Sequence, residues 1–442
     1  MSAREIKCPL PPTERCNRLF LAATLLALAF SSAPAEAQLR GHGGPVRALA
    51  VSADGSVALS GSFDTSAIRW SLARGVAEQV LRFHAGAVDA VMFLKDGRLA
   101  TAGEDARIAL WTPGKTAPDE VLEGHRGPIV ALAVSPDGTE LASAAWDRTV
   151  RLWPLAGGAA RVLEGHQQNV NAVAFAPDGK TLVSAGYDAS LRFWPLAGDH
   201  APILANLPTP LNALAIAPDG EIATAGADGR IYFVTPAGAV IAKLEASPAP
   251  ITSLAMSRDG ELIAAASMSG AVAVVERKTR TLLRNLAGPR GPVWAVAFVG
   301  GSDALLSGGA DRIIHRWNAK SGELLDAATS GGAEDPLAAY AGDPGADVFR
   351  HCVACHTLKP DEGNRAGPTL HGLFGRRIAT LPGYNFSPAL TRLDIVWTPE
   401  TVAKLFELGP ERYTPGTKMP EQTIGSAAER EALVKFLERA TK

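Results

Sequence analysis

Two cysteines and a histidine stand close together in the C-terminal quarter of the chain, as Cys352-Val-Ala-Cys355-His356. Cysteines two residues apart and followed at once by histidine have the spacing of covalent haem c attachment. On a helical stretch both thiols and the imidazole lie on neighbouring turns. The sulfurs then reach the haem vinyl groups, and the imidazole reaches the iron from the same side. The motif therefore predicts one covalently bound haem c with His356 as an iron ligand.

Two other uses of paired cysteines fit this sequence less well. A structural zinc site needs four ligands, and the other two cysteines, Cys8 and Cys16, are far from the pair in sequence. A thioredoxin-like redox pair lies beside a βαβ pattern, and none is visible around Cys352 and Cys355. The sequence therefore favours haem attachment over a zinc site or a redox pair.

An electron-transfer haem needs a sixth iron ligand, which is often methionine. The last third of the chain contains one methionine, Met419, in the segment Tyr-Thr-Pro-Gly-Thr-Lys-Met-Pro at residues 413–420. Prolines and a glycine keep such a segment irregular, so it can cross a haem face as a loop. A lone methionine can also be a core residue. The setting of Met419 favours iron ligation.

Residues 343–442 resemble a class I c-type cytochrome of the mitochondrial and bacterial c2 kind. The matching segments come in the family's order and cover nearly the whole stretch: the motif at 352–356, Gly-Pro-Thr-Leu-His-Gly-Leu-Phe-Gly-Arg at 367–376, Pro-Gly-Tyr-Asn-Phe-Ser at 382–387, Trp397 and the Met419 loop. The resemblance implies a small all-α domain.

The resemblance also implies roles for individual residues. The carbonyl of Pro368 would orient His356, as hydrogen-bond partners do for metal-bound imidazoles. The side chains around the haem propionates would be Arg376, Tyr384, Trp397 and Thr417. Two positions depart from the vertebrate pattern, because Phe386 and Phe406 replace tyrosines. Each loses one hydroxyl, which would tune the potential without abolishing haem binding.

The N-terminus has the pattern of an export signal. Arg15 and Arg18 precede an apolar run at 19–30, and Ala35-Glu36-Ala37 follows as a cleavage triplet. An uncleaved anchor is the alternative, but the run is well short of the ~20 residues that span a bilayer. We expect residues 1–37 to be removed near Ala37. The exported chain would then be periplasmic in a bacterium, and its remaining cysteines are those of the haem motif.

Length and charge narrow the function further. A chain of 442 residues is too long for one ordinary core, so more than one domain is expected. The 43 basic and 45 acidic residues nearly balance. The sequence therefore shows no polyanion-binding signature, and nucleic acid is not an expected partner.

The middle of the chain repeats about every 40 residues, which is the period of propeller blades. The clearest markers are a histidine, a Pro-Asp-Gly type turn, a Ser/Thr-x-x-x-Asp turn and a tryptophan. Five of the seven units have the tryptophan, which is Trp70, Trp111, Trp153, Trp194 or Trp317. These markers resemble the WD40 family. They imply an all-β, seven-bladed propeller at 38–328, followed by a linker at 329–342 and the cytochrome domain at 343–442. We expect residues 323–325 to supply the outer strand of blade seven. This blade would then be built mostly from its own residues, with at most a short N-terminal addition.

Four units combine a histidine, a serine or threonine, an aspartate and the tryptophan, as in His125, Ser143, Asp147 and Trp153. These sets suggest catalytic triads, but recurrence once per blade is typical of a structural hydrogen-bond network. Unit seven has Pro289 in place of the histidine. Units five and six lack both histidine and tryptophan, so we expect those blades to be the least rigid.

The residue before each turn aspartate lies on the face that WD40 proteins commonly use for partners. Here the aromatic members of that series are Phe63, Trp146 and Tyr187. Exposed aromatic residues on one face would form a protein-binding patch. Packing over neighbouring loops is the alternative.

These features favour a periplasmic electron-transfer protein whose propeller docks a redox partner protein. With His356 and Met419 as axial ligands, the iron would cycle between Fe(III) and Fe(II) without substrate turnover. A propeller dehydrogenase that passes electrons to its own haem is one alternative. A redox-sensing scaffold is another alternative, and the sequence does not separate it from the electron-transfer protein.

Overall fold

The computed structural model describes residues 39–198, 201–287, 291–325, 337–349, 352–353, 356–360, 364, 367–382, 384, 386–417, 419 and 423–442. The expected signal peptide at 1–37, residues 329–336 of the expected linker, Pro289 and Cys355 lie outside the described residues. The propeller and the C-terminal segment are described separately below.

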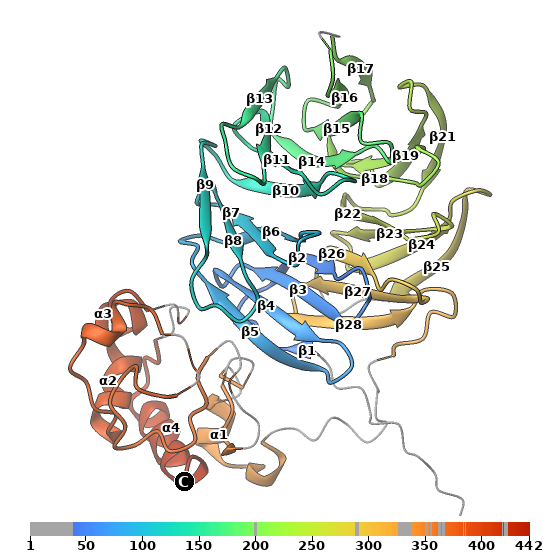
Figure 1. The fold of residues 1–442 in the computed structure, drawn as a ribbon. Helices are drawn as coiled ribbons and strands as arrows, with labels where there is room; N and C mark the ends of the chain where they lie inside the picture. The colour runs from blue at the N-terminus through green and yellow to red at the C-terminus, as the bar shows by residue number, and fades with distance from the viewer. Residues whose placement is uncertain are drawn as a thin grey trace, which may run out of the picture. The chain divides into compact units, whose positions relative to one another are not determined.

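Seven antiparallel four-stranded sheets form the propeller (Figure 1). From the innermost strand outward, blades one to four are β2 (Val46–Val51), β3 (Val57–Ser62), β4 (Ser66–Ser71), β5 (Val76–Arg82); β6 (Val88–Phe93), β7 (Leu99–Gly103), β8 (Arg107–Trp111), β9 (Glu120–Glu123); β10 (Ile129–Val134), β11 (Glu140–Ala145), β12 (Thr149–Pro154), β13 (Arg161–Glu164); and β14 (Val170–Phe175), β15 (Thr181–Gly186), β16 (Ser190–Pro195), β17 (Ile203–Asn206).

The remaining blades follow the same order. They are β18 (Leu211–Ile216), β19 (Ile222–Gly226), β20 (Arg230–Val234), β21 (Val240–Glu245); β22 (Ile251–Met256), β23 (Leu262–Ser267), β24 (Ala271–Glu276), β25 (Thr281–Ala287); and β26 (Val293–Phe298), β27 (Ala304–Gly309), β28 (Ile313–Asn318), β1 (Leu39–Arg40). Each innermost strand contacts the innermost strand of the next blade, and β26 contacts β2. The seven-unit ring predicted from the repeats is therefore closed.

The sequence explains why these segments form blades. The second strand of each blade lies between two neighbouring sheets and is built from small or compact side chains, as in β11, where Ala142, Ala144 and Ala145 are fully buried. Tight turns separate the strands, and Gly138 has a φ of +81° in the Pro-Asp-Gly turn before β11. This left-handed conformation favours glycine.

Ring closure uses a short piece from the other end of the propeller. The two-residue strand β1 pairs with Ile313 and Ile314 of β28 and becomes the fourth strand of blade seven. Residues 323–325 contribute less than an outer strand, because they make one bridge between Leu324 and Trp317. The prediction that residues 323–325 form the outer strand is therefore wrong. The expected short N-terminal addition is present and provides that strand instead.

The histidine–serine–tryptophan networks are structural, as their recurrence predicted. In blade three, His125 Nδ1 lies 2.8 Å from Asp147 Oδ2 and His125 Nε2 lies 2.7 Å from Ser143 Oγ. The indole N–H of Trp153 donates to the same Ser143 oxygen at 2.8 Å. Blades one, two and four repeat this arrangement at His42, His84 and His166. Each network joins the loop before a blade to its second and third strands.

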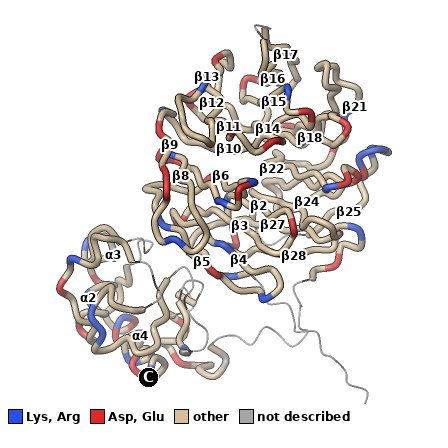
Figure 2. The backbone as a smooth tube through the Cα atoms, in the orientation of Figure 1, with Lys and Arg blue, Asp and Glu red and all other residues tan. Residues whose placement is uncertain are grey.

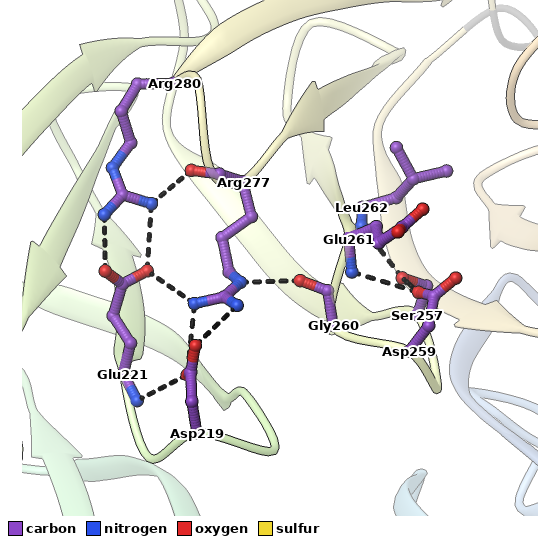
Figure 3. A network of polar contacts seen from close by, with 9 residues as sticks. All are labelled: Asp219, Glu221, Ser257, Asp259, Gly260, Glu261, Leu262, Arg277 and Arg280. Carbon is purple, nitrogen blue, oxygen red and sulfur yellow. Dashed lines mark hydrogen bonds and ion pairs between the residues drawn. The ribbon is translucent and has the colours of Figure 1, made fainter.

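Blades five and six are joined by an ionic cluster (Figure 3). The guanidinium of Arg277, after β24, donates to Asp219 Oδ2 at 2.7 Å and to Glu221 Oε1 at 3.1 Å, both in or near the β18–β19 turn. Its Nε donates to the Gly260 carbonyl at 2.5 Å. Arg280 donates to the same Glu221 carboxylate at 2.9 Å. The blades that lack the histidine–tryptophan network are thus fastened to each other by charge.

Blade seven replaces its missing histidine from within. His315 Nε2 on β28 lies 2.7 Å from Asp311 Oδ2, while the Trp317 indole donates to Ser307 Oγ at 2.8 Å. The aspartate of this blade therefore keeps a histidine partner, although that histidine comes from the third strand and not from the preceding loop.

The C-terminal segment is made of short helices and long loops. Its helices are η1 (Ala338–Tyr340), α1 (Pro344–Phe349), η3 (Leu390–Arg392), α2 (Pro399–Leu408), α3 (Pro410–Tyr413) and α4 (Ala427–Ala440). Asp343 caps the start of α1, because its Oδ1 accepts the Gly345 N–H at 2.8 Å. Helices α1 and α4 approach closely at Gly345, where a Cβ would lie 2.5 Å from Phe436 Cβ. One apolar core unites α1, α2 and α4.

Candidate haem site

An apolar cavity lies inside the C-terminal segment. Its walls in this segment are mainly buried or partly buried side chains of the three core helices and the loop at 370–373: Phe349, Leu370, Leu373, Val402, Leu405, Phe406, Leu433 and Leu437. Trp397, Tyr384 and Phe386 add aromatic rings to the lining. Such a cavity suits a large, flat, mostly apolar ligand.

His356 lies against this cavity with a fixed ring orientation. Its Nδ1 lies 2.7 Å from the carbonyl oxygen of Pro368. With Nδ1 donating to that carbonyl, Nε2 is the nitrogen that would bind iron, because the Nδ1 hydrogen bond fixes the tautomer. Gly367 makes room for the ring, since a Cβ there would lie 2.6 Å from His356 Nδ1.

Cys352 lines the same cavity and is 8% exposed. Burial raises the pKa of its thiol to about 12. A redox-active thiol needs the opposite shift, because the thiolate is the reactive form. The environment of Cys352 therefore argues against a thioredoxin-like pair and suits a cysteine held in a thioether.

Met419 also lines the cavity and packs against the core of the segment. Its N–H donates to Thr417 Oγ1 at 3.1 Å, and the Thr417 N–H donates to the Thr414 carbonyl at 3.0 Å. The Ser387 hydroxyl donates to the Gly416 carbonyl at 2.7 Å, which ties this loop to the segment around Tyr384. Local hydrogen bonds thus position the expected loop, and the apolar packing turns Met419 inward.

The residues expected around the propionates all line the cavity: Arg376, Tyr384, Trp397 and Thr417. Arg376 is braced by two carbonyls, donating to His371 O at 3.1 Å and Thr369 O at 3.0 Å. Burial lowers the pKa of its guanidinium, which nevertheless stays charged at neutral pH. The Tyr384 and Phe386 rings meet edge to face at 4.7 Å.

Three side chains that support the site were not predicted from the sequence motifs. Asn364 Oδ1 accepts the Thr369 N–H at 2.8 Å, next to Pro368. Thr414 is buried and donates to the Pro410 carbonyl at 2.8 Å, and Ser387 holds the methionine loop. A polar residue flanking each ligand loop is the only hint the sequence offers, and many unrelated loops share it.

The residues fit haem c chemically. The cavity brings together an imidazole with an oriented ring, a buried cysteine, a thioether and an arginine within apolar walls. His371, the nearest other histidine in the sequence, is not among the cavity-lining residues, and its buried Nδ1 has no hydrogen-bond partner within the described part of the chain. Among the described residues, no three His, Cys, Asp or Glu side chains gather as a metal site.

The aromatic series on the propeller lies as the repeats predicted. Phe63, Trp146 and Tyr187 are 42%, 45% and 47% exposed, so they do not pack away under loops. Phe63 meets the ring of Trp294 at 5.3 Å, and Trp146 hydrogen-bonds Asn171 at 3.0 Å.

Charged residues of both signs are spread along the chain (Figure 2). In the described part, no helix is both long and apolar enough to traverse a membrane.

Comparisons with known proteins divide at the same place as the fold. The family described as "IFT122 first beta-propeller" matches residues 87–334, and the family described as "WD domain, G-beta repeat" matches residues 35–71. Together these matches include strands of all seven blades and leave out residues 72–86.

The C-terminal part of the chain matches curated proteins named cytochrome c. One from Cochliobolus lunatus is 42% identical over 99 residues, which are 22% of this chain and 91% of the relative. One from Arabidopsis thaliana is 42% identical over 99 residues, 22% of this chain and 88% of the relative. Cytochrome c type-1 from Ascaris suum is 40% identical over 103 residues, 23% of this chain and 88% of the relative. The chain therefore belongs to the WD40-type propeller family in its first part and to the cytochrome c family in its last.

Proposed function

We propose that this protein transfers electrons through one haem c, held in a small all-α class I cytochrome domain at residues 343–442. His356 Nε2 and the Met419 sulfur would be the axial ligands, and Cys352 and Cys355 would form the thioethers. Bound in this way, the haem supplies a one-electron Fe(III)/Fe(II) couple. The observation that carries the proposal is the 2.7 Å contact between His356 Nδ1 and the Pro368 carbonyl beside an apolar cavity that Met419 also lines.

The residues around the cavity have separate tasks in this proposal. The Pro368 carbonyl holds the imidazole and increases its basicity, which strengthens its bond to a metal. Arg376 places a permanent positive charge near the propionates, with Tyr384, Trp397 and Thr417 as further polar neighbours. The apolar walls of the cavity would exclude water from the haem macrocycle. Phe386 and Phe406 line the cavity without a hydroxyl, which would adjust the potential.

The propeller would serve as the scaffold that docks a redox partner protein. It supplies a rigid closed ring with exposed aromatic side chains at Phe63, Trp146 and Tyr187. Exposed aromatic residues on a rigid scaffold are typical of protein-binding surfaces. We also propose a periplasmic location after cleavage of residues 1–37, because haem c attachment in bacteria takes place outside the inner membrane.

Haem attachment tests the proposal directly. The full chain is expressed with the haem c attachment machinery, alongside Cys352→Ala, Cys355→Ala and the double variant. The wild type should keep its haem after denaturation and solvent extraction, with the added mass of one haem. Each single variant should keep it by one bond, and the double variant should lose it. Extraction of the haem from the wild type would reject covalent attachment, and Cys352→Ser and Cys355→Ser provide size-matched repeats.

A further inference from the structure

One face of blades three and four combines exposed aromatic and cationic side chains. The β11–β12 turn of blade three holds Trp146 and Arg148, and both are exposed. Its neighbour is the loop before β10, because the Trp146 N–H donates to the Pro128 carbonyl at 2.9 Å. That loop presents exposed Arg126, whose N–H donates to Asp147 Oδ2 at 2.9 Å. Trp146 thus lies beside two arginines that come from different loops.

The same surface continues onto blade four. The Trp146 indole N–H donates to Asn171 Oδ1 at 3.0 Å, and Asn171 in turn donates to the Leu211 carbonyl at 2.9 Å. The indole is therefore anchored by its edge, although the side chain stays 45% exposed. Tyr187 occupies the equivalent turn of blade four and is 47% exposed. We call Arg126, Trp146, Arg148 and Tyr187 the blade 3–4 patch.

The exposed charge of the patch is positive. Its two aspartates, Asp147 and Asp188, have side chains only 10% and 8% exposed, and they are occupied by His125, His166 and backbone N–H groups. The exposed carboxylate on the equivalent turn of blade two, Glu104, accepts the Ala87 N–H at 3.1 Å. Glu164, opposite Thr149 on β13, is an exposed carboxylate at the edge of the patch. Within the patch, the ionic groups that a partner can reach are the guanidinium groups of Arg126 and Arg148, which suit carboxylates.

The left-handed backbone at Arg148 belongs to the repeat. Its φ is +71°, a conformation that favours glycine, and blades five and six have Gly229 and Gly270 in this turn position. The other blades also keep a left-handed residue there: Thr65, Ala106, Ala189 and Arg312. The turn therefore forms with different side chains, so replacing Arg148 by glycine should leave the fold intact.

We infer that the blade 3–4 patch docks an acidic segment of a partner protein, whose carboxylates pair with Arg126 and Arg148 while apolar side chains pack on Trp146 and Tyr187. Tryptophan, tyrosine and arginine are the residues that contribute most to protein interfaces. In naming a redox partner, the inference rests on the proposed function. The docking chemistry itself does not require the haem.

The test measures binding of labelled ten-residue peptides to the full-length holoprotein. One peptide alternates glutamate with leucine, and the matched peptide alternates lysine with leucine. The glutamate peptide should bind more tightly, and its affinity should fall with added salt. Arg126→Ala and Arg148→Gly should each weaken binding about threefold, as exposed ion pairs do. Trp146→Ala should weaken it about tenfold or more.

Arg148→Gly separates docking from folding, because it removes the charge and relieves the backbone at the same time. Its melting temperature should stay close to that of the wild type, and Arg148→Lys should keep most of the affinity. Lys180→Ala is the charge-matched control, since Lys180 is an exposed cation on blade four at the opposite end of the strands. Its affinity should not change.

Equal binding of both peptides, unchanged affinity in the two arginine variants, or an equal loss in Lys180→Ala would overturn the inference. The haem spectrum of each sample is recorded alongside. A normal spectrum without peptide binding rejects the docking surface alone, whereas peptide binding without a haem spectrum rejects the proposed electron transfer alone.

Discussion

The Nδ1 atom of His356 lies 2.7 Å from the carbonyl oxygen of Pro368, twelve residues further along the chain. This one hydrogen bond selects the tautomer of the imidazole and fixes its plane, so Nε2 is the nitrogen that would bind the proposed haem iron. The same proline follows Gly367, where the lack of a side chain lets the ring approach the backbone.

Gly367→Ala should displace the His356 ring, because the new Cβ would lie 2.6 Å from Nδ1. We expect the low-spin haem spectrum to weaken and the haem to bind exogenous imidazole more readily than in the wild type. Absorption spectroscopy with an imidazole titration measures both. Gly425→Ala is the matched control, since no atom lies within 4 Å of its Cβ position. Identical spectra for Gly367→Ala and the wild type would contradict the positioning role.

Asp147→Ala should destabilise the propeller and leave the haem spectrum unchanged. It removes the carboxylate that accepts from His125 and from the Arg126 N–H, at a cost of about 2 kcal/mol. Burial alone would raise the Asp147 pKa, but these hydrogen bonds hold it well below its ordinary value. A carboxyl with a lowered pKa stabilises the fold above about pH 4 and loses that contribution as the pH falls.

Thermal unfolding of the wild type and of Asp147→Ala at pH 7 and pH 3 tests this pH dependence. The difference in melting temperature between the two proteins should be smaller at pH 3. Asp178→Ala, in an exposed turn of blade four, should change stability far less. An altered haem spectrum with unchanged melting would contradict the structural role of Asp147 in the propeller.

Arg277→Ala should destabilise blades five and six by about 2 kcal/mol, because it removes a buried guanidinium that bonds Asp219, Glu221 and the Gly260 carbonyl. The loss is limited, since Asp219 is 57% exposed and Glu221 keeps Arg280. Denaturant unfolding measures the loss, and hydrogen exchange should locate it in those two blades. Lys278→Ala is the neighbouring control, since Lys278 is exposed. Near-equal stability of both variants would show that the cluster does not hold the blades together.

Asp89 should make the propeller less stable as the pH rises from about 4 to about 6. Burial raises the pKa of Asp89 to about 6, with Glu104 and Asp105 adding to the shift and Arg47 opposing it. The unfolded chain, with an ordinary pKa near 4, releases this proton first, so the ionised form disfavours folding across that range. Asp89→Asn should lose this part of the pH dependence in melting experiments. Parallel curves for variant and wild type would contradict the shift.

The sequence predicted the blades well because their pattern repeats, and it predicted the cavity residues because the cytochrome motifs lie in short segments. It missed contacts between distant segments. Arg277 and Asp219 are 58 residues apart and belong to different blades, so no local spacing relates them. His315 was missed because it reaches Asp311 from the third strand, whereas the pattern places the histidine before the first.

The outer strand of blade seven shows the same limit. Residues 39–40 pair with residues 313–314, although nearly the whole propeller sequence lies between them. Two residues are also too few to show a strand pattern. In blades five and six, the absence of histidine and tryptophan indicated weak blades. The charged residues that join these blades belong to turns, where charge is ordinary and predicts no contact.

The axial ligand pair is the central claim, and redox spectroscopy of Met419→Ala in the full-length holoprotein tests it most directly. The wild type should give a low-spin spectrum, a sulfur-to-iron charge-transfer band in the ferric state and a single one-electron transition. The variant should lose that band, become high-spin or bind added imidazole, and shift to a lower potential, because methionine ligation raises it. A variant with the band and the potential of the wild type would contradict ligation by Met419.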